Sequence, residues 1–223
     1  QEEDENGWSG TAAVGFAATT GNAETSSLTV GINTALVSGK WRHEFTGAAL
    51  RATAEDQDTG EVDTTAERYQ LGYQGNYQIS ERSYIFGRAN FDRDLFSGFE
   101  RQLSETIGYG RTLFKNDAQL LEGEVGFGAS QQKRNDGTEA NQAIARAALR
   151  YTWEFSDSGS FNQRFSVESG SENTLLESVT ELKAKLIGNI GLGVSYTVRN
   201  NSDVPDGSAS TDTFTAVTLQ YDF

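Results

Sequence analysis

The chain has no cysteine and no methionine, and its 223 residues include one proline and one histidine. The lack of cysteine excludes a disulfide-stapled scaffold and a thiolate metal site. Basic residues are also scarce, with 18 Lys and Arg against 32 Asp and Glu and a net charge of −14. A general nucleic-acid binder needs clustered basic residues to neutralise phosphates, so the sequence excludes that class. Because the chain opens on Gln1 and lacks Met, we expect a mature exported protein whose signal peptide has been removed.

A long apolar run is missing as well. The longest charge-free stretch, residues 6–23, has the length of a membrane helix of about 18 residues, but Gly, Ser and Thr interrupt it. Its apolar residues alternate with small or polar ones, as Trp8, Ala12, Val14 and Phe16 show. Successive side chains of a strand point to opposite faces, so this period indicates a β-strand and excludes a helical span.

The same alternation recurs along the chain and predicts an all-β fold. Residues 1–7 are expected to form an acidic N-terminal segment, and residues 8–223 a single antiparallel up-and-down β-barrel of about twelve strands. The predicted strands cover residues 8–20, 25–37, 40–54, 64–79, 83–95, 100–114, 118–132, 140–155, 160–170, 173–187, 190–201 and 210–223.

The connections between these strands alternate between two classes. One consists of short turns, such as residues 38–39 and 188–189, whereas the other tends to be longer and more acidic, as at residues 55–63, 133–139 and 200–209. Short turns at one end and longer loops at the other are typical of a barrel that spans the outer membrane of Gram-negative bacteria. The even strand number then places both termini on the short-turn, periplasmic side.

Charge sorting predicts which face of each strand lines the lumen. A charge on the lipid face costs about 2–4 kcal/mol at the bilayer midplane, so charged side chains should turn inward. In residues 100–114 this rule turns Glu105 and Arg111 inward and leaves Thr106, Gly108 and Gly110 facing lipid. The predicted lumen-lining set comprises Arg42, Glu44, Arg51, Arg68, Arg88, Asp92, Asp94, Arg101, Glu105, Arg111, Glu122, Glu124, Arg146, Arg150, Glu154, Arg164, Glu168, Glu177, Glu181, Lys183, Lys185 and Arg199.

Two interpretations of this charged lumen stay open. In the first, the charges guide small polar solutes through a passive pore. In the second, cross-strand ion pairs plug the interior of an envelope-structural protein, because opposite charges on neighbouring strands can pair and Arg suits such pairing better than Lys. A twelve-strand barrel lies between the filled eight-strand barrels and the wide sixteen-strand porins, so strand number alone does not decide.

Aromatic residues gather at the expected periplasmic ends of the strands. Trp and Tyr favour membrane interfaces, so these residues support a membrane barrel over a soluble β-sandwich. The predicted interface aromatics are Trp8, Trp41, Tyr77, Trp153, Phe155, Phe161 and Phe223.

The last strand resembles the assembly signal of bacterial outer-membrane barrels. That signal has a terminal Phe preceded by apolar or aromatic residues at alternating positions, here Val217, Leu219, Tyr221 and Phe223. Charged and polar residues take the other face of the same strand. The signal implies that the barrel assembly machinery is a partner of this chain.

The chain as a whole is similar to the YdiY-like family of salt-induced outer-membrane proteins. The resemblance implies an outer-membrane barrel and no agreed biochemical activity, with outer-membrane lipids and lipopolysaccharide as further partners. It rests on the segments Trp8-Ser9-Gly10, Gly21-Asn22-Ala23-Glu24-Thr25, Arg93-Asp94-Leu95-Phe96-Ser97-Gly98, Gly108-Tyr109-Gly110 and Tyr221-Asp222-Phe223.

The sequence offers no catalytic motif, and we predict no enzyme, no cofactor and no dedicated metal site. His43 invites comparison with barrel lipases, but general-base chemistry needs a nearby hydroxyl and an orienting group, and no nucleophile motif is present. We expect an interfacial histidine. The acidic run at residues 55–63 lacks the spacing of a calcium loop, although it could share divalent cations with lipid phosphates.

The alternatives are a lipid-modifying barrel enzyme, an adhesin that binds a partner through its acidic loops, and a soluble barrel of the lipocalin type. The first depends on His43 and the second on residues 55–63. The third is a structural rival, since a soluble barrel would stay in solution without detergent and would lack the heat-dependent gel shift of a membrane barrel.

Overall fold

Twelve β-strands make up the fold of the computed structural model, which describes residues 7–19, 24–56, 59–94, 99–134, 136–204 and 209–223. Within these residues, no helix is long and apolar enough to cross a membrane. The strands are β1 (Gly7–Thr19), β2 (Glu24–Ser38), β3 (Trp41–Glu55), β4 (Val62–Ser80), β5 (Ser83–Asp94), β6 (Phe99–Lys115), β7 (Gln119–Arg134), β8 (Glu139–Ser156), β9 (Gly159–Gly170), β10 (Thr174–Ile187), β11 (Ile190–Asn201) and β12 (Thr211–Asp222).

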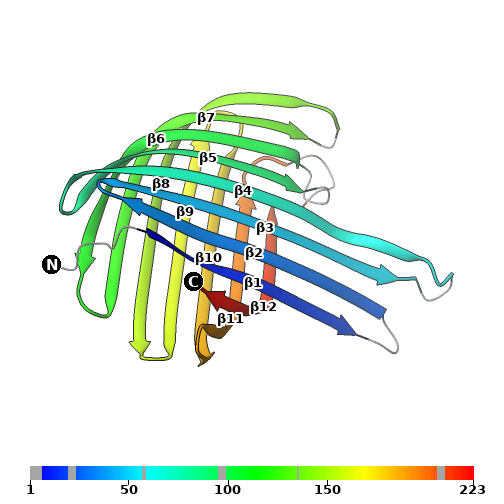
Figure 1. Ribbon diagram of the computed structural model, residues 1–223. Coiled ribbons are helices and arrows are strands. Elements are labelled where there is room, and N and C mark those ends of the chain that lie inside the picture. The colour runs from blue at the N-terminus through cyan, green and yellow to red at the C-terminus, as the bar shows by residue number, and fades with distance from the viewer. Residues whose placement is uncertain (1–6, 20–23, 57–58, 95–98, 135, 205–208) are drawn as a thin grey trace.

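The strands form one closed antiparallel barrel. Each strand pairs with its neighbours in the chain, and β1 pairs with β12 to close the ring. Figure 1 shows the sheet curving round until β1 and β12 meet near the C-terminus. The prediction of a twelve-strand up-and-down barrel is confirmed, and every predicted strand is present with its ends displaced by two residues at most.

The seam between β1 and β12 is short and lies close to the end of the chain. Its ladder joins residues 11–14 to residues 219–222. The Gly10 N–H donates to the Phe223 carbonyl at 2.8 Å, and the Phe223 N–H donates to the Gly10 carbonyl at 3.0 Å. Inside the barrel, the Thr11 hydroxyl donates to Asp222 Oδ1 at 2.7 Å. The last residues of the chain therefore supply much of the closure.

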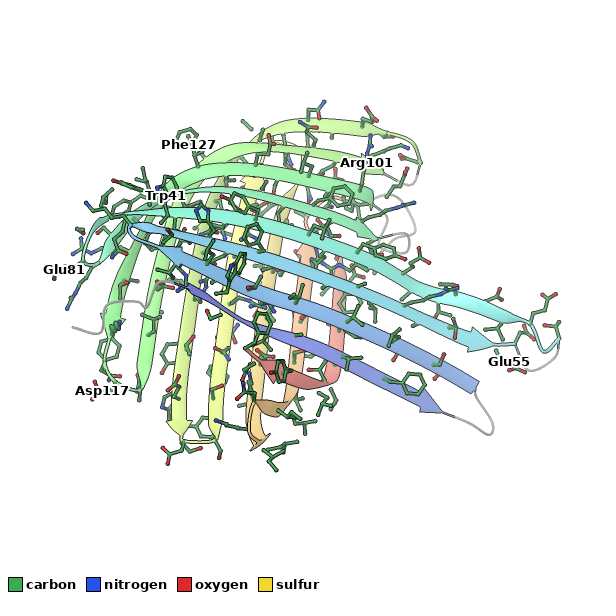
Figure 2. All side chains as sticks on the ribbon, viewed as in Figure 1. Trp41, Glu55, Glu81, Arg101, Asp117 and Phe127 are labelled. Atoms are coloured by element: carbon green, nitrogen blue, oxygen red, sulfur yellow. The ribbon has the colours of Figure 1, made fainter. Side chains whose placement is uncertain are left out.

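The barrel has two distinct ends, which we call the short-turn end and the long-loop end. The short-turn end holds the start of β1, the end of β12 and the five hairpin turns between β2–β3, β4–β5, β6–β7, β8–β9 and β10–β11. Gly39 and Gly188 in these turns have φ of 57° and 55°, the left-handed conformation that tight hairpin turns require. Figure 2 shows Glu81 and Asp117 at this end, and Glu55 and Arg101 towards the opposite one.

The outer surface is apolar and the interior is polar. Phe16, Leu71 and Phe127 are 72%, 62% and 66% exposed on the outside, and Figure 2 shows Phe127 pointing away from the barrel wall. Most of the buried side chains are instead amides, hydroxyls and charged groups, with Gln74 and Gln220 among them. This arrangement is the reverse of a soluble barrel and matches a barrel surrounded by lipid.

Strand β6 corrects the predicted register. Arg101, Glu105 and Arg111 are exposed on the outer face, whereas Gln102 and Thr106 are buried inside. The inward glycines explain this choice, because aromatic side chains from β5 lie directly over them. A Cβ on Gly110 would lie 2.2 Å from the Tyr84 ring, and one on Gly108 would lie 2.7 Å from the Phe86 ring. Placing these three charged residues in the lumen was therefore wrong.

Arg51 is also outside the lumen. It lies on the same face of β3 as the exposed Trp41 and Phe45, and opposite Glu67 of β4. The inward position belongs to the adjacent Leu50, which lies opposite the buried Arg68. Other predicted features fall outside the described residues. They are residues 1–6 of the acidic segment, residues 21–23 and 95–98 of the family motifs, and Pro205.

Candidate functional site: the charged lumen

A buried ion-pair network occupies the long-loop half of the lumen. Asp92 Oδ2 accepts hydrogen bonds from Arg68 Nε at 3.1 Å, Arg68 Nη2 at 2.8 Å and Gln70 Nε2 at 2.7 Å. Asp92 Oδ1 lies 2.9 Å from Arg199 Nη1. The other end of the Arg199 guanidinium donates to Gln102 Oε1 at 2.8 Å. The Arg68, Asp92 and Arg199 side chains are at most 8% exposed, so these charges depend on one another for solvation.

Several of these contacts cross the lumen. Asp92 is on β5 and Arg199 on β11, six strands away around the ring, and Arg68 on β4 reaches Glu177 on β10 at 3.8 Å. Twelve strands spaced about 4.8 Å apart and tilted about 40° would enclose a circle roughly 24 Å across. Extended Arg and Asp side chains joined by a hydrogen bond span little more than half of this diameter, so the two walls must lie closer together than in a circular barrel. The barrel is therefore flattened at this level.

A second network lies towards the short-turn end. Arg150 of β8 crosses to Glu44 of β3 with 3.1 Å between Nη2 and Oε2, and lies 3.8 Å from Glu122. Arg42 Nε lies 2.8 Å from Oε1 of the same Glu44.

A third group of polar contacts surrounds Glu124 of β7. Glu124 accepts hydrogen bonds from Arg146 Nη1 at 2.7 Å, Gln74 Nε2 at 2.7 Å and the Tyr84 hydroxyl at 3.0 Å. Arg146 Nε also lies 3.6 Å from Glu168. Ion pairs thus extend along much of the lumen.

Two cavities of very different size lie along the described part of the lumen. The cavity in the long-loop half has a volume of about 40 Å³, and its lining includes Asp92, Gln102 and Arg199. It has room for a few water molecules at most. The cavity nearer the short-turn end has a volume of about 460 Å³. One of its walls, on β1 and β2, carries small neutral residues such as Thr11, Gly31 and Ala35, while arginines and glutamates of β3, β5 and β7–β10 line the rest.

The remaining predicted lumen residues follow no single pattern. Glu181 accepts a hydrogen bond from Gln220 at 2.7 Å, and Lys183 pairs with Asp222 beside the seam. Glu154 and Lys185 are exposed near the short-turn end. Asp94 is buried in the long-loop half. Arg88 and Arg164 line the larger cavity without a carboxylate within 4.0 Å in the described part of the chain.

Charge sorting missed the neutral members of the networks. Gln70, Gln74, Tyr84 and Gln102 each hold a buried carboxylate or guanidinium in place. Their alternation with outward apolar residues could have identified the first three. Gln102 was hidden because the register of β6 was assigned wrongly.

The outer surface near the short-turn end carries connected aromatic rings. Trp8 stacks on Phe45, Phe45 contacts Tyr73, and Trp41 contacts Tyr77, with ring centroids 5.0–6.0 Å apart. His43 joins these rings by stacking on Trp41 at 5.5 Å. A girdle of this kind is typical of a membrane interface. On β8, Trp153 contacts Phe155 edge-on, and on β9 Phe161 contacts Tyr151.

His43 has a hydroxyl neighbour, but that hydroxyl belongs to a tyrosine. His43 Nδ1 and Tyr73 Oη are 2.9 Å apart on the exposed outer face. A base for acyl transfer needs an acidic or amide group to orient the ring and a serine-type nucleophile. Within the described residues, the hydrogen-bond partner of the His43 ring is the Tyr73 phenol, an arrangement that suits an interfacial position.

The residues of the predicted assembly signal and of the acidic loop lie at opposite ends of the barrel. Val217, Leu219 and Tyr221 on the outer face of β12, and Phe223 directly after it, are each about half exposed. At the long-loop end, the Thr59 N–H donates to Asp56 Oδ1 at 3.0 Å. Among the residues whose structure is described, no cluster of three or more His, Asp or Glu side chains could hold a metal ion.

A loop carboxylate at the same end is held in its charged form. Hydrogen bonds from Thr138, chiefly from its side chain and then from its backbone N–H, lower the pKa of Asp136. Asp136 therefore contributes negative charge to the long-loop rim at neutral pH.

Comparison with known proteins supports both the fold and the family. The model of a family described as "Protein of unknown function, DUF481" matches residues 12–223. The Escherichia coli (strain K12) protein named Uncharacterized protein YdiY is 29% identical over 208 residues, which is 93% of this chain and 80% of that protein. This match confirms the YdiY-like resemblance.

Two solved barrels share the architecture at low sequence identity. An outer membrane channel from Pseudomonas putida F1 is 8% identical, with a TM-score of 0.55 over 98% of this chain and 96% of that one. The translocator domain of the autotransporter NalP from Neisseria meningitidis is 12% identical, with a TM-score of 0.52 over 100% of this chain and 90% of that one. Both likenesses support the barrel fold of this chain.

Proposed function

The chain belongs to the DUF481 family, and we propose that it is a narrow, passive channel for small polar solutes in the bacterial outer membrane, constricted by ion pairs across its lumen. The apolar outer surface and the aromatic girdle support the membrane location. By the same proposal, the short-turn end with both termini faces the periplasm, and the chain reaches the membrane after export.

The observation that carries this proposal is the set of ion pairs between opposite walls. Arg199–Asp92 and Arg68–Glu177 each join strands six apart, and Arg150–Glu44 joins strands five apart. A solute can pass this level only where these side chains swing aside. Since charged and hydrogen-bonded side chains line the constriction, the path would accept small hydrated solutes and reject apolar ones.

Single-channel recording in planar bilayers tests the channel. We expect small conductance steps from the wild-type barrel and severalfold larger steps from the double variant Asp92→Ala/Arg199→Ala, which removes the connection between β5 and β11. Glu81→Ala, on a hairpin tip, is the matched control and should conduct like the wild type. If neither the wild type nor the double variant gives steps, the channel is ruled out.

A second candidate is a purely structural role in the envelope. The same cross-lumen ion pairs favour it, because they brace the two walls of a flattened barrel against each other. Absence of conductance from both the wild type and the double variant would leave this role standing.

Our proposal assigns no reaction to the barrel. Phospholipase and acyl-transfer assays on wild-type protein and on His43→Ala check this, and we expect no turnover from either. Turnover that is lost in His43→Ala would overturn it, because His43 would then serve as a base.

The proposed partners are lipids at the outer surface and the barrel assembly machinery. Arg93, Arg101 and Lys133 lie on β5, β6 and β7 at the long-loop rim, where Arg101 pairs with Lys133 in the strand ladder and Lys133 Nζ lies 2.6 Å from Glu100 Oε2. Lipopolysaccharide phosphates would meet this rim in an outer membrane. The outward face of β12 is the surface that we propose for the assembly machinery. Divalent cations could join the lipid phosphates at the acidic loop around Asp56.

A further inference from the structure

The larger cavity has more arginines than its carboxylates neutralise. Four carboxylates line it, and each lies within 4.0 Å of an arginine other than Arg88 and Arg164. The pairs are Glu44 with Arg42 and Arg150, Glu122 with Arg150, Glu124 with Arg146, and Glu177 with Arg68. In the described residues, Arg88 and Arg164 are thus the two lining arginines without a carboxylate partner.

Arg88 is held in position by neutral groups. Its Nη1 donates to Gln74 Oε1 at 3.3 Å and its Nη2 donates to Asn90 Oδ1 at 3.1 Å. Its Nε is buried and has no hydrogen-bond partner in the described residues. Gln74 is itself fixed by its bond to Glu124. The guanidinium is therefore oriented by neutral groups with no carboxylate within 4.0 Å in the described residues, which is costly for a partly buried charge unless an anion completes the site.

Arg164 faces the same cavity under different constraints. It lies directly opposite Arg150 in the β8–β9 ladder, so two like charges meet on neighbouring strands, an unfavourable arrangement. Arg150 turns to Glu44 and Glu122, whereas the Arg164 side chain has no hydrogen-bond or ion-pair partner in the described part of the chain. It remains exposed to the cavity.

The facing wall leaves room for a ligand and offers no competing charge. On β1 and β2 the cavity is lined by small or neutral residues, Ser9, Gly10, Thr11, Gly31, Asn33, Thr34 and Ala35. The volume of about 460 Å³ falls within the ~300–1,000 Å³ typical of sites for small molecules. Arg88 lines the narrow cavity as well, so it lies where the wide part of the lumen meets the constriction.

We infer that this cavity is a binding site for small organic anions, whose carboxylate or phosphate group is held by Arg88 and Arg164. A guanidinium presents N–H donors in a planar fork that matches the oxygens of such groups. Such a site would make the proposed channel selective for anionic solutes. This role in transport rests on the proposed function. Binding itself does not require conduction.

Thermal unfolding of the folded barrel in detergent tests the binding, with citrate as the probe at constant ionic strength. A ligand that binds the folded state raises the unfolding midpoint as its concentration passes the Kd. We expect a rise for the wild type and for Arg82→Gln, a control on a hairpin turn. For Arg88→Gln/Arg164→Gln the citrate concentration that gives the same rise should increase about tenfold or more, since hydrogen bonds to charged groups are lost.

An equal rise in all three proteins, or no rise in the wild type, would overturn the site. The heat-dependent gel shift confirms that each variant is folded. If the double variant does not fold, Arg164→Gln replaces it, because that side chain has no bonding partner to lose in the described residues.

Reversal potentials in a KCl gradient separate this inference from the channel proposal. We expect the wild type to prefer chloride and Arg88→Gln/Arg164→Gln to lose that preference. A conducting barrel without anion preference contradicts the selectivity and leaves the channel intact. A barrel that never conducts contradicts the channel, while the citrate titration still decides the binding site.

Discussion

Removing the Asp92 carboxylate should destabilise the barrel more than any change to an ion pair on its rim. Asp92 joins Arg68 and Arg199, and all three side chains are less than a tenth exposed. Taking one partner from a buried ion pair costs about 3–5 kcal/mol, because the remaining charge stays buried. After Asp92→Ala, Arg68 keeps Glu177 at 3.8 Å and Arg199 keeps Gln102 at 2.8 Å. We therefore expect the lower end of that range, about 3 kcal/mol.

Urea unfolding of the barrel in lipid vesicles, followed by tryptophan fluorescence, measures this loss. A change of about 3 kcal/mol lowers the ratio of folded to unfolded protein by a factor of a hundred or more. Glu139→Ala is the matched control, because it also removes a carboxylate from an arginine, here Arg101 at 3.5 Å. The Arg101 and Glu139 side chains are both about 60% exposed. Exposed ion pairs contribute at most about 1 kcal/mol to stability.

The double variant Asp92→Ala/Arg199→Ala sharpens the test. If the cost comes from an uncompensated buried charge, removing Arg199 as well should restore part of the stability lost in Asp92→Ala. The reasoning is refuted if Asp92→Ala costs no more than Glu139→Ala. It is equally refuted if the effects of Asp92→Ala and Arg199→Ala simply add, since the two groups would then not interact across the lumen.

Three further predictions concern packing, register and closure. Gly128→Ala should destabilise the barrel by about 1–3 kcal/mol, because the added Cβ would lie 1.8 Å from the Glu105 carbonyl oxygen. A Cβ at Gly87 would meet nothing within 4 Å, so Gly87→Ala should be near neutral in the same urea assay. Equal effects of the two substitutions would contradict this prediction. Since the chain has no Cys, a single Cys at position 105 should be quenched by lipid-soluble probes when labelled, and one at position 106 should not; the reverse pattern would restore the register predicted from charge. Deleting Phe223 removes the two backbone hydrogen bonds to Gly10, so the heat-dependent gel shift of a folded barrel should be lost or reduced, and an unchanged shift would show that closure does not need this residue.

The fold was predictable because its determinants are local. Alternation such as Tyr69, Leu71 and Tyr73 against Arg68, Gln70 and Gly72 places lipid-facing and lumen-facing residues on opposite sides of one strand, and no distant contact is needed to recognise it. The turn class at each strand end is equally local. For that reason the structure displaces the predicted strand ends by no more than two residues.

Strand β6 shows where a single local rule fails. Charge sorting turned Glu105 and Arg111 inward, but the same face carries Leu103, Ile107 and Tyr109, whose apolar area outweighs the two charges. The opposite face is rich in glycine because Tyr84 and Phe86 of the neighbouring strand need the space inside. Weighing apolar area together with charge would have favoured the observed register. The need for inward glycine appears only when two strands are paired.

Contacts across the lumen cannot be predicted from alternation, because they depend on the shape of the closed ring. Glu44 and Arg150 are 106 residues apart in sequence and meet only because the barrel is flattened. Side-chain size on the inner face then determines where the walls touch. Where β4 and β5 face β10 and β11, long charged side chains from both walls meet and the lumen closes. Where β1 and β2 present small residues such as Gly31 and Ala35, one wall falls short and a cavity remains. The open and closed parts of this lumen thus depend on two things, the size of the inner-face residues and the shape of the ring. The residue sizes can be read from the sequence, but the shape of the ring cannot.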